Sequence, residues 1–175
     1  MPRWEPAVVP DGANGERTRT YSWDDPHELL ARTAGMSGLE ALRLIAAGEL
    51  PPPPIGKTLG FGAIEVEEGR ATFTVEPAEF HYNPIGVVHG GLALALLDSA
   101  MGCAVHSTLA AGVAYTTLEV KANFVRPLTS STGPIRCTGT VVHGGRTVAT
   151  AEGRIVDADG KLYAHGTSTL LVFGG

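Results

Sequence analysis

Two groups of residues near the middle of the chain have the types and spacing needed for chemistry. The first is a single carboxylate, Asp98, within the otherwise apolar stretch 92–105. An unpaired buried carboxylate is costly, so Asp98 must find a hydrogen-bond partner, a cleft or a proton. A carboxylate arranged in a cleft is typical of general-base or nucleophilic chemistry. The alternative is a structural Asp that caps neighbouring backbone.

The second group is His89-Gly90-Gly91, at the start of the same stretch. A glycine inside a helix costs about 1 kcal/mol relative to Ala, whereas in the first turn it costs less. There it also leaves backbone N–H groups uncovered. Free N–H groups at the positive end of a helix dipole suit a developing oxyanion. His89 alone would be interpreted as structural, but its place beside Gly90 and near Asp98 favours a functional site.

The spacing of these two groups bears on assembly. Gly90 and Asp98 are eight residues apart, or about 12 Å along a helix at ~1.5 Å per residue. A carbonyl group held at the Gly90 N–H is therefore hard to reach for Asp98 of the same chain. If the two residues act together, they should come from two subunits across a two-fold interface.

The element that positions both groups is a predicted helix over 90–109. It must be buried on nearly every face, because only Asp98 and Ser99 are polar between residues 92 and 105. Its apolar part, 92–105, is fourteen residues long, shorter than the about 20 that a membrane span needs. A predicted β-hairpin precedes it, and predicted strands with short turns follow it. The strand ranges are 58–67 and 70–76, then 113–125, 134–142, 147–157 and 161–173.

This order of elements predicts an α+β fold. One long buried helix should be wrapped by a curved antiparallel sheet of about five to six strands. The sequence Val-His-Gly-Gly occurs a second time, at 142–145, between two of the strands. There it predicts a tight hairpin turn in which Gly144 and Gly145 take positive φ.

A short helical extension is expected before this domain. Asp24 or Asp25, followed by Pro26, is a helix-start signal, and Ser37 starts a second helix that Gly48 ends. Four prolines, 51–54, then form a stiff linker. The expected organisation is a disordered tail over 1–22, a helical extension with its linker over 23–55, and the main domain over 56–175.

The composition excludes several classes of protein. The net charge of −5 argues against a general nucleic-acid surface, which needs a basic face. The two cysteines, Cys103 and Cys137, show no metal-ligand spacing and fit a reducing compartment. The N-terminus lacks the apolar core of a signal peptide. We therefore expect a cytoplasmic protein with neither a nucleic-acid nor a membrane partner.

The sequence resembles the hotdog-fold acyl-CoA thioesterases of the phenylacetate-pathway (PaaI-like) branch. The resemblance rests on NPIGVVHGG from Asn83 to Gly91, with Asp98 nine residues after His89. Further matching pieces are TTLEVKANFVRP at 116–127 and AEGRIVDADGKLYAHGTSTLLVF at 151–173. The resemblance covers about 56–173, and its fold agrees with the one expected above.

The resemblance implies hydrolysis of an acyl-CoA, aryl or medium-chain, to a free acid and CoA. Asp98 would be the general base or nucleophile, and the Gly90 N–H would be the oxyanion donor. Asn83 and His89 would hold the thioester or the water. A hydroxyl on the following strand would orient the water, and the register favours Thr117 over its neighbour Thr116. No metal or organic cofactor is implied.

The resemblance also implies a homodimer with shared active sites, and dimers paired into a tetramer. The CoA phosphates require cationic or N–H partners. The substrate-binding candidates, each with a plain structural alternative, are Gly91, Thr116, Arg126, His143, Gly144, Gly145 and Arg146. Two rival functions stay open at this point, a hotdog-fold enoyl hydratase or dehydratase and a non-catalytic acyl-CoA-binding protein.

Overall fold

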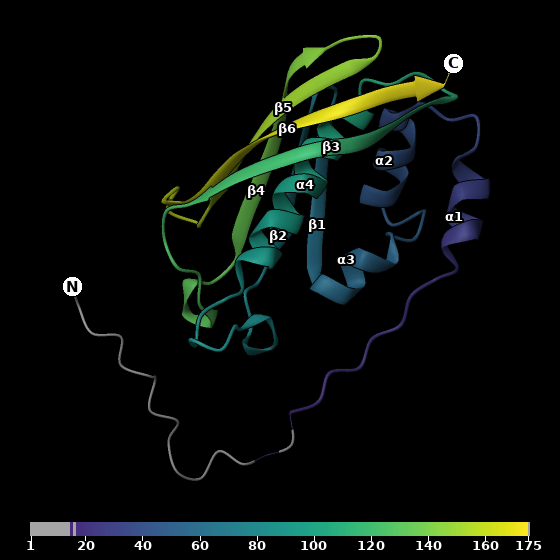
Figure 1. The fold of residues 1–175 in the computed structure, drawn as a ribbon. Helices are drawn as coiled ribbons and strands as arrows, with labels where there is room; N and C mark the ends of the chain where they lie inside the picture. Colours follow the sequence, from purple (N-terminus) through teal and green to yellow (C-terminus); the bar gives the residue numbers. More distant parts are fainter. Residues whose placement is uncertain (1–14, 16, 175) are drawn as a thin grey trace.

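The sheet and the long helix expected from the sequence are both present (Figure 1). The computed structural model describes residues 15 and 17–174. Six antiparallel strands form one sheet in the order β1-β2-β4-β5-β6-β3. The predicted α+β hotdog architecture is therefore confirmed. The elements are α1 (Pro26–Thr33), α2 (Gly38–Ala46), α3 (Pro54–Leu59), β1 (Phe61–Glu67), β2 (Arg70–Val75), the 3₁₀ turn η1 (Glu79–His81), α4 (Gly90–His106), β3 (Val113–Phe124), the 3₁₀ turn η2 (Ser130–Thr132), β4 (Ile135–Gly144), β5 (Val148–Val156) and β6 (Leu162–Gly174).

Helix α4 lies in the concave face of the sheet and forms the centre of the core (Figure 1). Leu96, Leu97 and Met101 have no exposed surface, which explains why the helix is apolar on nearly every face. The helix ends at His106, three residues before the predicted end at Leu109. Within the described part of the chain, no helix is long and apolar enough to cross a lipid bilayer.

The helix approaches strand β4 unusually closely. A Cβ added at Gly139 would lie 2.4 Å from the backbone carbonyl carbon and oxygen of Ala100. Such a distance between a side chain and a backbone is not tolerated, so position 139 requires glycine. The absence of a side chain at this point lets α4 settle onto the sheet.

A β-bulge in β3 changes which side chains face the helix. Thr117 pairs with Leu170 of β6, and Glu119 pairs with the next residue, Thr169, so Leu118 has no partner across the strand. Before the bulge, odd-numbered residues face inward; after it, Val120 and Ala122 do. Regular alternation would have placed Glu119 and Lys121 against the core instead.

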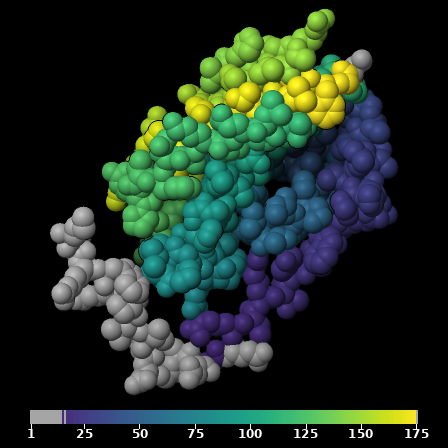
Figure 2. Space-filling model, in the orientation of Figure 1, coloured from purple at the N-terminus to yellow at the C-terminus, as the bar shows by residue number. Residues whose placement is uncertain are grey.

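The N-terminal extension forms helices at the predicted signals. The Asp25 side chain accepts a hydrogen bond from the His27 N–H, and the Ser37 hydroxyl accepts one from the Glu40 N–H. Gly48 takes a φ of 76°, as a helix-ending glycine does. Helix α2 packs on β1 and α4. Figure 2 shows the N-terminal segments gathered along one side of the molecule.

The linker between this extension and the sheet differs from the prediction. The first three prolines lie outside any helix or strand, but Pro54 opens helix α3, and the first strand begins at Phe61 rather than Thr58. Proline is favoured at the first position of a helix, where its missing N–H costs nothing. Gly60, with a φ of 71°, ends the helix.

The hairpin with the second Val-His-Gly-Gly also differs from the prediction. Strand β4 continues through Gly144, and neither Gly144 nor Gly145 has a positive φ. Residue 145 is glycine because space is short, rather than because φ is positive. A Cβ there would lie 2.5 Å from the Val148 carbonyl oxygen. A Cβ at Gly144 would meet nothing within 4 Å.

The segment before α1 contacts the folded domain. The disordered tail expected over 1–22 falls outside the described residues at 1–14 and 16. Arg17 pairs with Glu79 at 2.7 Å. The Arg19 guanidinium donates hydrogen bonds to the carbonyl oxygens of Thr58 and Lys57, at the end of α3, and lies over the ring of Phe80.

Candidate active site

Asp98 is held by a single hydroxyl. The Thr117 Oγ1 donates a hydrogen bond of 2.9 Å to Asp98 Oδ1, joining the middle of α4 to the edge strand β3. Both residues are partly buried. Asp98 has no other hydrogen-bond or ion-pair partner among residues 15 and 17–174. Its second carboxylate oxygen is therefore free to accept a proton or a hydrogen bond from a ligand.

The Asp98–Thr117 pair faces an apolar cavity of about 410 Å³. One wall comes from α4 and β3, a second from β1 and β2, and the third from the N-terminal extension. This volume lies within the about 300–1,000 Å³ that is typical of ligand pockets. The remaining lining residues are Leu42, Ile45, Pro52, Pro53, Ile55, Gly56, Lys57, Phe61, Gly62, Ile64, Phe73, Ser99, Cys103 and Tyr115.

Cys103 lies in this cavity but is not suited to act as a nucleophile. Burial, with a smaller contribution from the Asp98 carboxylate, raises the pKa of the Cys103 thiol to about 12. A thiol attacks as its thiolate, which is scarce at neutral pH when the pKa is so high. Asp98 is therefore the reactive group of the cavity that the geometry supports best.

The first turn of α4 lies at a different place. The His89 side chain caps the helix, since its Nδ1 accepts a hydrogen bond of 2.9 Å from the Gly91 N–H. The Gly91 N–H is thereby used, whereas the Gly90 N–H has no acceptor within the described residues. Gly90 thus offers the free donor that an oxyanion requires.

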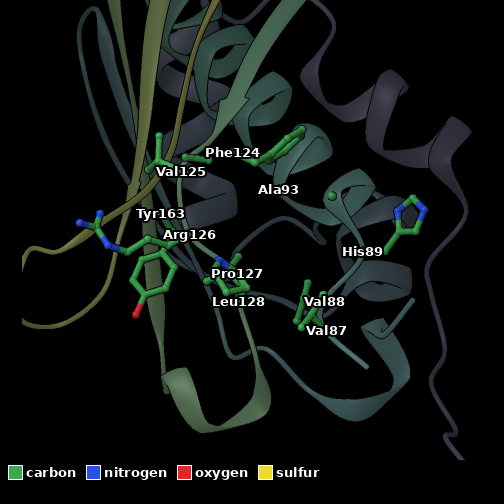
Figure 3. Close-up of a pocket in the computed structure, with 12 residues that line it drawn as sticks. Val87, Val88, His89, Ala93, Phe124, Val125, Arg126, Pro127, Leu128 and Tyr163 are labelled. Atoms are coloured by element: carbon green, nitrogen blue, oxygen red, sulfur yellow. The ribbon is translucent and has the colours of Figure 1, made fainter. Parts of the chain in front are cut away.

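A second cavity, of about 340 Å³, lies beside Gly90 (Figure 3). The ring of Phe124 reaches the first turn of α4, and a Cβ at Gly90 would lie 3.4 Å from that ring. His89 projects away from Phe124, Arg126 and Tyr163 (Figure 3). The Arg126 guanidinium donates a hydrogen bond to the Leu162 carbonyl oxygen and lies on the exposed rim.

Asn83 shapes the loop before the helix. Its side-chain oxygen accepts hydrogen bonds from the N–H groups of Ile85, at 3.0 Å, and Val87, at 3.3 Å. Its backbone N–H donates to the Val87 carbonyl oxygen at 2.8 Å. Only the side-chain NH₂ group of Asn83 therefore remains available to a ligand.

The predicted site residues fall into separate groups within one chain. Asp98 and Thr117 are together, and Gly90, His89 and Arg126 line the other cavity. The two cavities have no lining residue in common. The remaining candidates line neither: Asn83, Gly91, Thr116, His143, Gly144, Gly145 and Arg146.

Sequence reasoning missed three groups of cavity residues. Ser99 and Cys103 are four residues apart and share one face of α4, which helical spacing alone could have indicated. Tyr115 precedes Thr117 by two residues and shares its face of β3, which the period of a strand could have indicated. No local signal points to the residues that α2 and α3 contribute.

Comparison with known proteins agrees with this fold. A family model described as the thioesterase superfamily matches residues 85–164. A proposed esterase of Saccharolobus solfataricus is 36% identical over 110 residues, which are 63% of this chain and 76% of that protein. A 1,4-dihydroxy-2-naphthoyl-CoA hydrolase of Listeria monocytogenes is 26% identical over 116 residues, 66% of this chain and 93% of that protein.

A solved structure extends the agreement to three dimensions. A proposed thioesterase of Ralstonia eutropha, related to phenylacetic acid degradation, superposes with a TM-score of 0.66 at 30% identity. The match covers 74% of this chain and 97% of that one. Since the family match spans the whole of α4, with Asp98 at its middle, and the fold agrees as well, this chain is an enzyme of the thioesterase superfamily, with the hotdog fold.

Proposed function

We propose that this enzyme hydrolyses acyl-CoA thioesters to a free acid and CoA. The observation that carries the proposal is the Asp98 carboxylate, held at 2.9 Å by Thr117 and facing an apolar cavity of about 410 Å³. The cavity provides room for an acyl group beside a base. The Listeria relative, named for hydrolysis of an aryl-CoA, supports the CoA thioester as substrate class.

In the proposed reaction Asp98 acts on the thioester carbonyl carbon through water. Because Thr117 donates its hydrogen bond to Oδ1, it is Oδ2 that takes a proton from the water. The water oxygen bonds to the carbonyl carbon at the same time. The Gly90 N–H stabilises the oxyanion that forms. The C–S bond then breaks, and the proton on Asp98 passes to the CoA thiolate. In the alternative course Asp98 attacks directly, and water hydrolyses the resulting anhydride.

The proposal includes a homodimer, because one chain keeps the base and the oxyanion donor in separate cavities. Strand β3 is at the edge of the sheet and exposes Leu118 and Phe124 by 58% and 55%. An exposed apolar edge of this length favours pairing with another strand. A two-fold axis there would bring the partner subunit's Gly90 towards Asp98, and two such dimers would form the tetramer.

The CoA phosphates are proposed to bind on the exposed rim of the dimer. Arg126 borders the cavity beside Gly90, and Arg146 lies in the exposed hairpin that follows His143. Guanidinium groups suit phosphate because they bind it through two parallel hydrogen bonds. A CoA-dependent reaction also fits the cytoplasmic location expected from the sequence.

Replacing Asp98 tests the proposal directly. We expect Asp98→Asn to lower kcat by about 10²–10⁴-fold on the best acyl-CoA, because a positioned acid–base group has been removed. The assay follows free thiol release, with circular dichroism and light scattering to show that the variant is a folded oligomer. Wild-type kcat in a folded Asp98→Asn would refute the role of Asp98. A change in enoyl absorbance without thiol release would indicate a hydratase instead.

A further inference from the structure

The cavity beside Asp98 adjoins another cavity. A third cavity, of about 530 Å³, lies between α1, the start of β3 and the end of α4. Tyr115 lines both this far cavity and the one beside Asp98, and no other described residue does. The side chain of Tyr115 is therefore the partition between them.

The ring of Tyr115 is fixed in this position from two sides. A Cβ at Gly102 would lie 2.9 Å from the Tyr115 hydroxyl oxygen, so the ring rests directly on the backbone of α4. The His106 ring packs behind it, with 5.5 Å between the ring centroids. The Tyr115 hydroxyl has no hydrogen-bond partner among residues 15 and 17–174. The ring thus blocks the space through its bulk.

The distance from the reacting group to this partition can be derived from the elements. Cys103 follows Asp98 by five residues, or about 7.5 Å along α4. Tyr115 precedes Thr117 by two residues, or about 6.6 Å along β3. An extended chain advances about 1.2 Å per bond, since three backbone bonds span about 3.3–3.6 Å. About six carbons beyond the thioester carbonyl therefore reach Tyr115.

We propose that Tyr115 is a specificity-determining residue that sets the longest acyl chain the enzyme accepts. The inference rests on the proposed thioesterase function and refines it. Straight acyl chains of about six to eight carbons end against the Tyr115 ring. Longer chains fit only when the ring is removed, because they then extend into the far cavity against α1.

The test compares kcat/KM across butanoyl- to hexadecanoyl-CoA by thiol release. For the wild type we expect a rise of about fourfold per methylene, the value of burying one CH₂ group, and a fall beyond octanoyl-CoA. Tyr115→Ala should raise the ratio of dodecanoyl- to hexanoyl-CoA by at least about tenfold. Tyr115→Leu gives the same comparison if the Ala variant does not fold.

Two matched variants identify what limits the length of the acyl chain. Tyr115→Phe keeps the ring, so its preferred chain length should equal that of the wild type. A shift as large as that of Tyr115→Ala would overturn the proposal, since it would trace the limit to the hydroxyl. Adding Met36→Trp, which narrows the far cavity, should reduce the gain of Tyr115→Ala. Persistence of the gain would contradict entry into that cavity.

A binding experiment separates this inference from the proposed function. S-alkyl-CoA thioethers cannot be hydrolysed, and calorimetry gives their affinity as a function of chain length. If the wild type hydrolyses no acyl-CoA but Tyr115→Ala shifts the preferred thioether length, the proposed function fails and the inference stands. If hydrolysis occurs but folded Tyr115→Ala keeps the wild-type length profile, the inference fails alone. Absence of both hydrolysis and thioether binding would overturn both.

Discussion

In the proposed reaction, Thr117 acts on the substrate through Asp98. Its hydroxyl donates to Oδ1 of this cavity-lining carboxylate at 2.9 Å, and Oδ2 has no partner among the described residues. Thr116, one residue earlier, is exposed on the opposite face of β3. We therefore expect Thr117 to be a positioning residue, whose effect should appear in turnover rather than in binding.

We expect Thr117→Val, which keeps the shape but lacks the hydroxyl, to lower kcat by about 10- to 100-fold. This is the scale of losing one hydrogen bond to a charged group, about 1.5–3 kcal/mol. KM should change little, and Thr117→Ser should restore most of kcat because it restores the donor. Steady-state kinetics on one acyl-CoA provide the measurement. A larger loss in Thr116→Val than in Thr117→Val would contradict this assignment.

At the scale of residues, the sequence indicated what is locally unusual. Asp98 was recognisable because it is a carboxylate inside an apolar helix, and the choice of Thr117 over Thr116 agrees with the observed hydrogen bond. Tyr115 was missed because an aromatic residue in a strand is ordinarily core. The role proposed for it depends on two cavities that only the packed elements create.

At the scale of elements, the contact between α4 and β4 depends on one missing side chain. The added Cβ of Gly139→Ala would meet the Ala100 backbone at 2.4 Å, and a backbone cannot rotate away as a side chain can. The helix and the strand would have to separate. That separation would loosen the packing of the buried face of α4, which includes Leu96 and Leu97.

We therefore expect Gly139→Ala to destabilise the protein by about 1–3 kcal/mol or more, as overpacking in a core does. Gly144→Ala is the matched control in the same strand. Its Cβ would meet nothing within 4 Å, and its φ is not positive, so its stability should equal that of the wild type. Urea unfolding at one protein concentration measures both. Equal stability of the two variants would disprove the close contact.

The junction of η1 and α3 contains a histidine with both ring nitrogens in use. His81 Nδ1 accepts a hydrogen bond from the Ala78 N–H at 3.0 Å, so its Nε2 donates to the Leu59 carbonyl oxygen at 2.9 Å. Burial lowers the pKa of His81, and the nearby Arg19 guanidinium adds to the decrease. Protonation at Nδ1 would break the bond to Ala78.

This arrangement predicts acid sensitivity. Because the folded pKa of His81 is below the unfolded value of about 6.5, the unfolded chain binds more protons as the pH falls. The stability that His81 contributes is present above pH ~6.5 and is lost as the pH falls towards the folded pKa. The free energy of unfolding should therefore fall less between pH 7.5 and pH 5 in His81→Gln than in the wild type. Identical pH dependence of the two would contradict this expectation.

The regular elements were predictable, and the exceptions have local causes. Alternation and turn residues located the strands to within a few residues. The four prolines suggested an extended linker, yet Pro54 is compatible with a first helical turn, so α3 was missed. The Gly144-Gly145 turn was assigned the wrong backbone angles because glycine is also selected where space is short, as at Gly145.

At the scale of the whole molecule, the proposed site requires two chains. Gly90 and Asp98 are eight positions apart in the helix, or about 12 Å, whereas both must act within about 3 Å of the reacting group. Within one chain the two residues also face different cavities. Each dimer should therefore have two sites, each built from both subunits.

Complementation provides the test. Asp98→Asn and Gly90→Val are each expected to be inactive, since one lacks the base and the other blocks the oxyanion donor. In their heterodimer one site combines both lesions and the other has neither. We expect activity near half that of the wild type in the isolated heterodimer. A folded, verified heterodimer without recovered activity would place the entire site within one chain.

The β-bulge at Leu118 constrains the number of residues that strand β3 can have. Tyr115 and Thr117 lie before the bulge, and Val120 and Ala122 follow it, so the extra residue lets both pairs face inward. Deleting one residue here would turn one pair outward, because side chains alternate with a period of two. Related chains should therefore differ in this strand by two residues or none, and single insertions and deletions should gather in the loops.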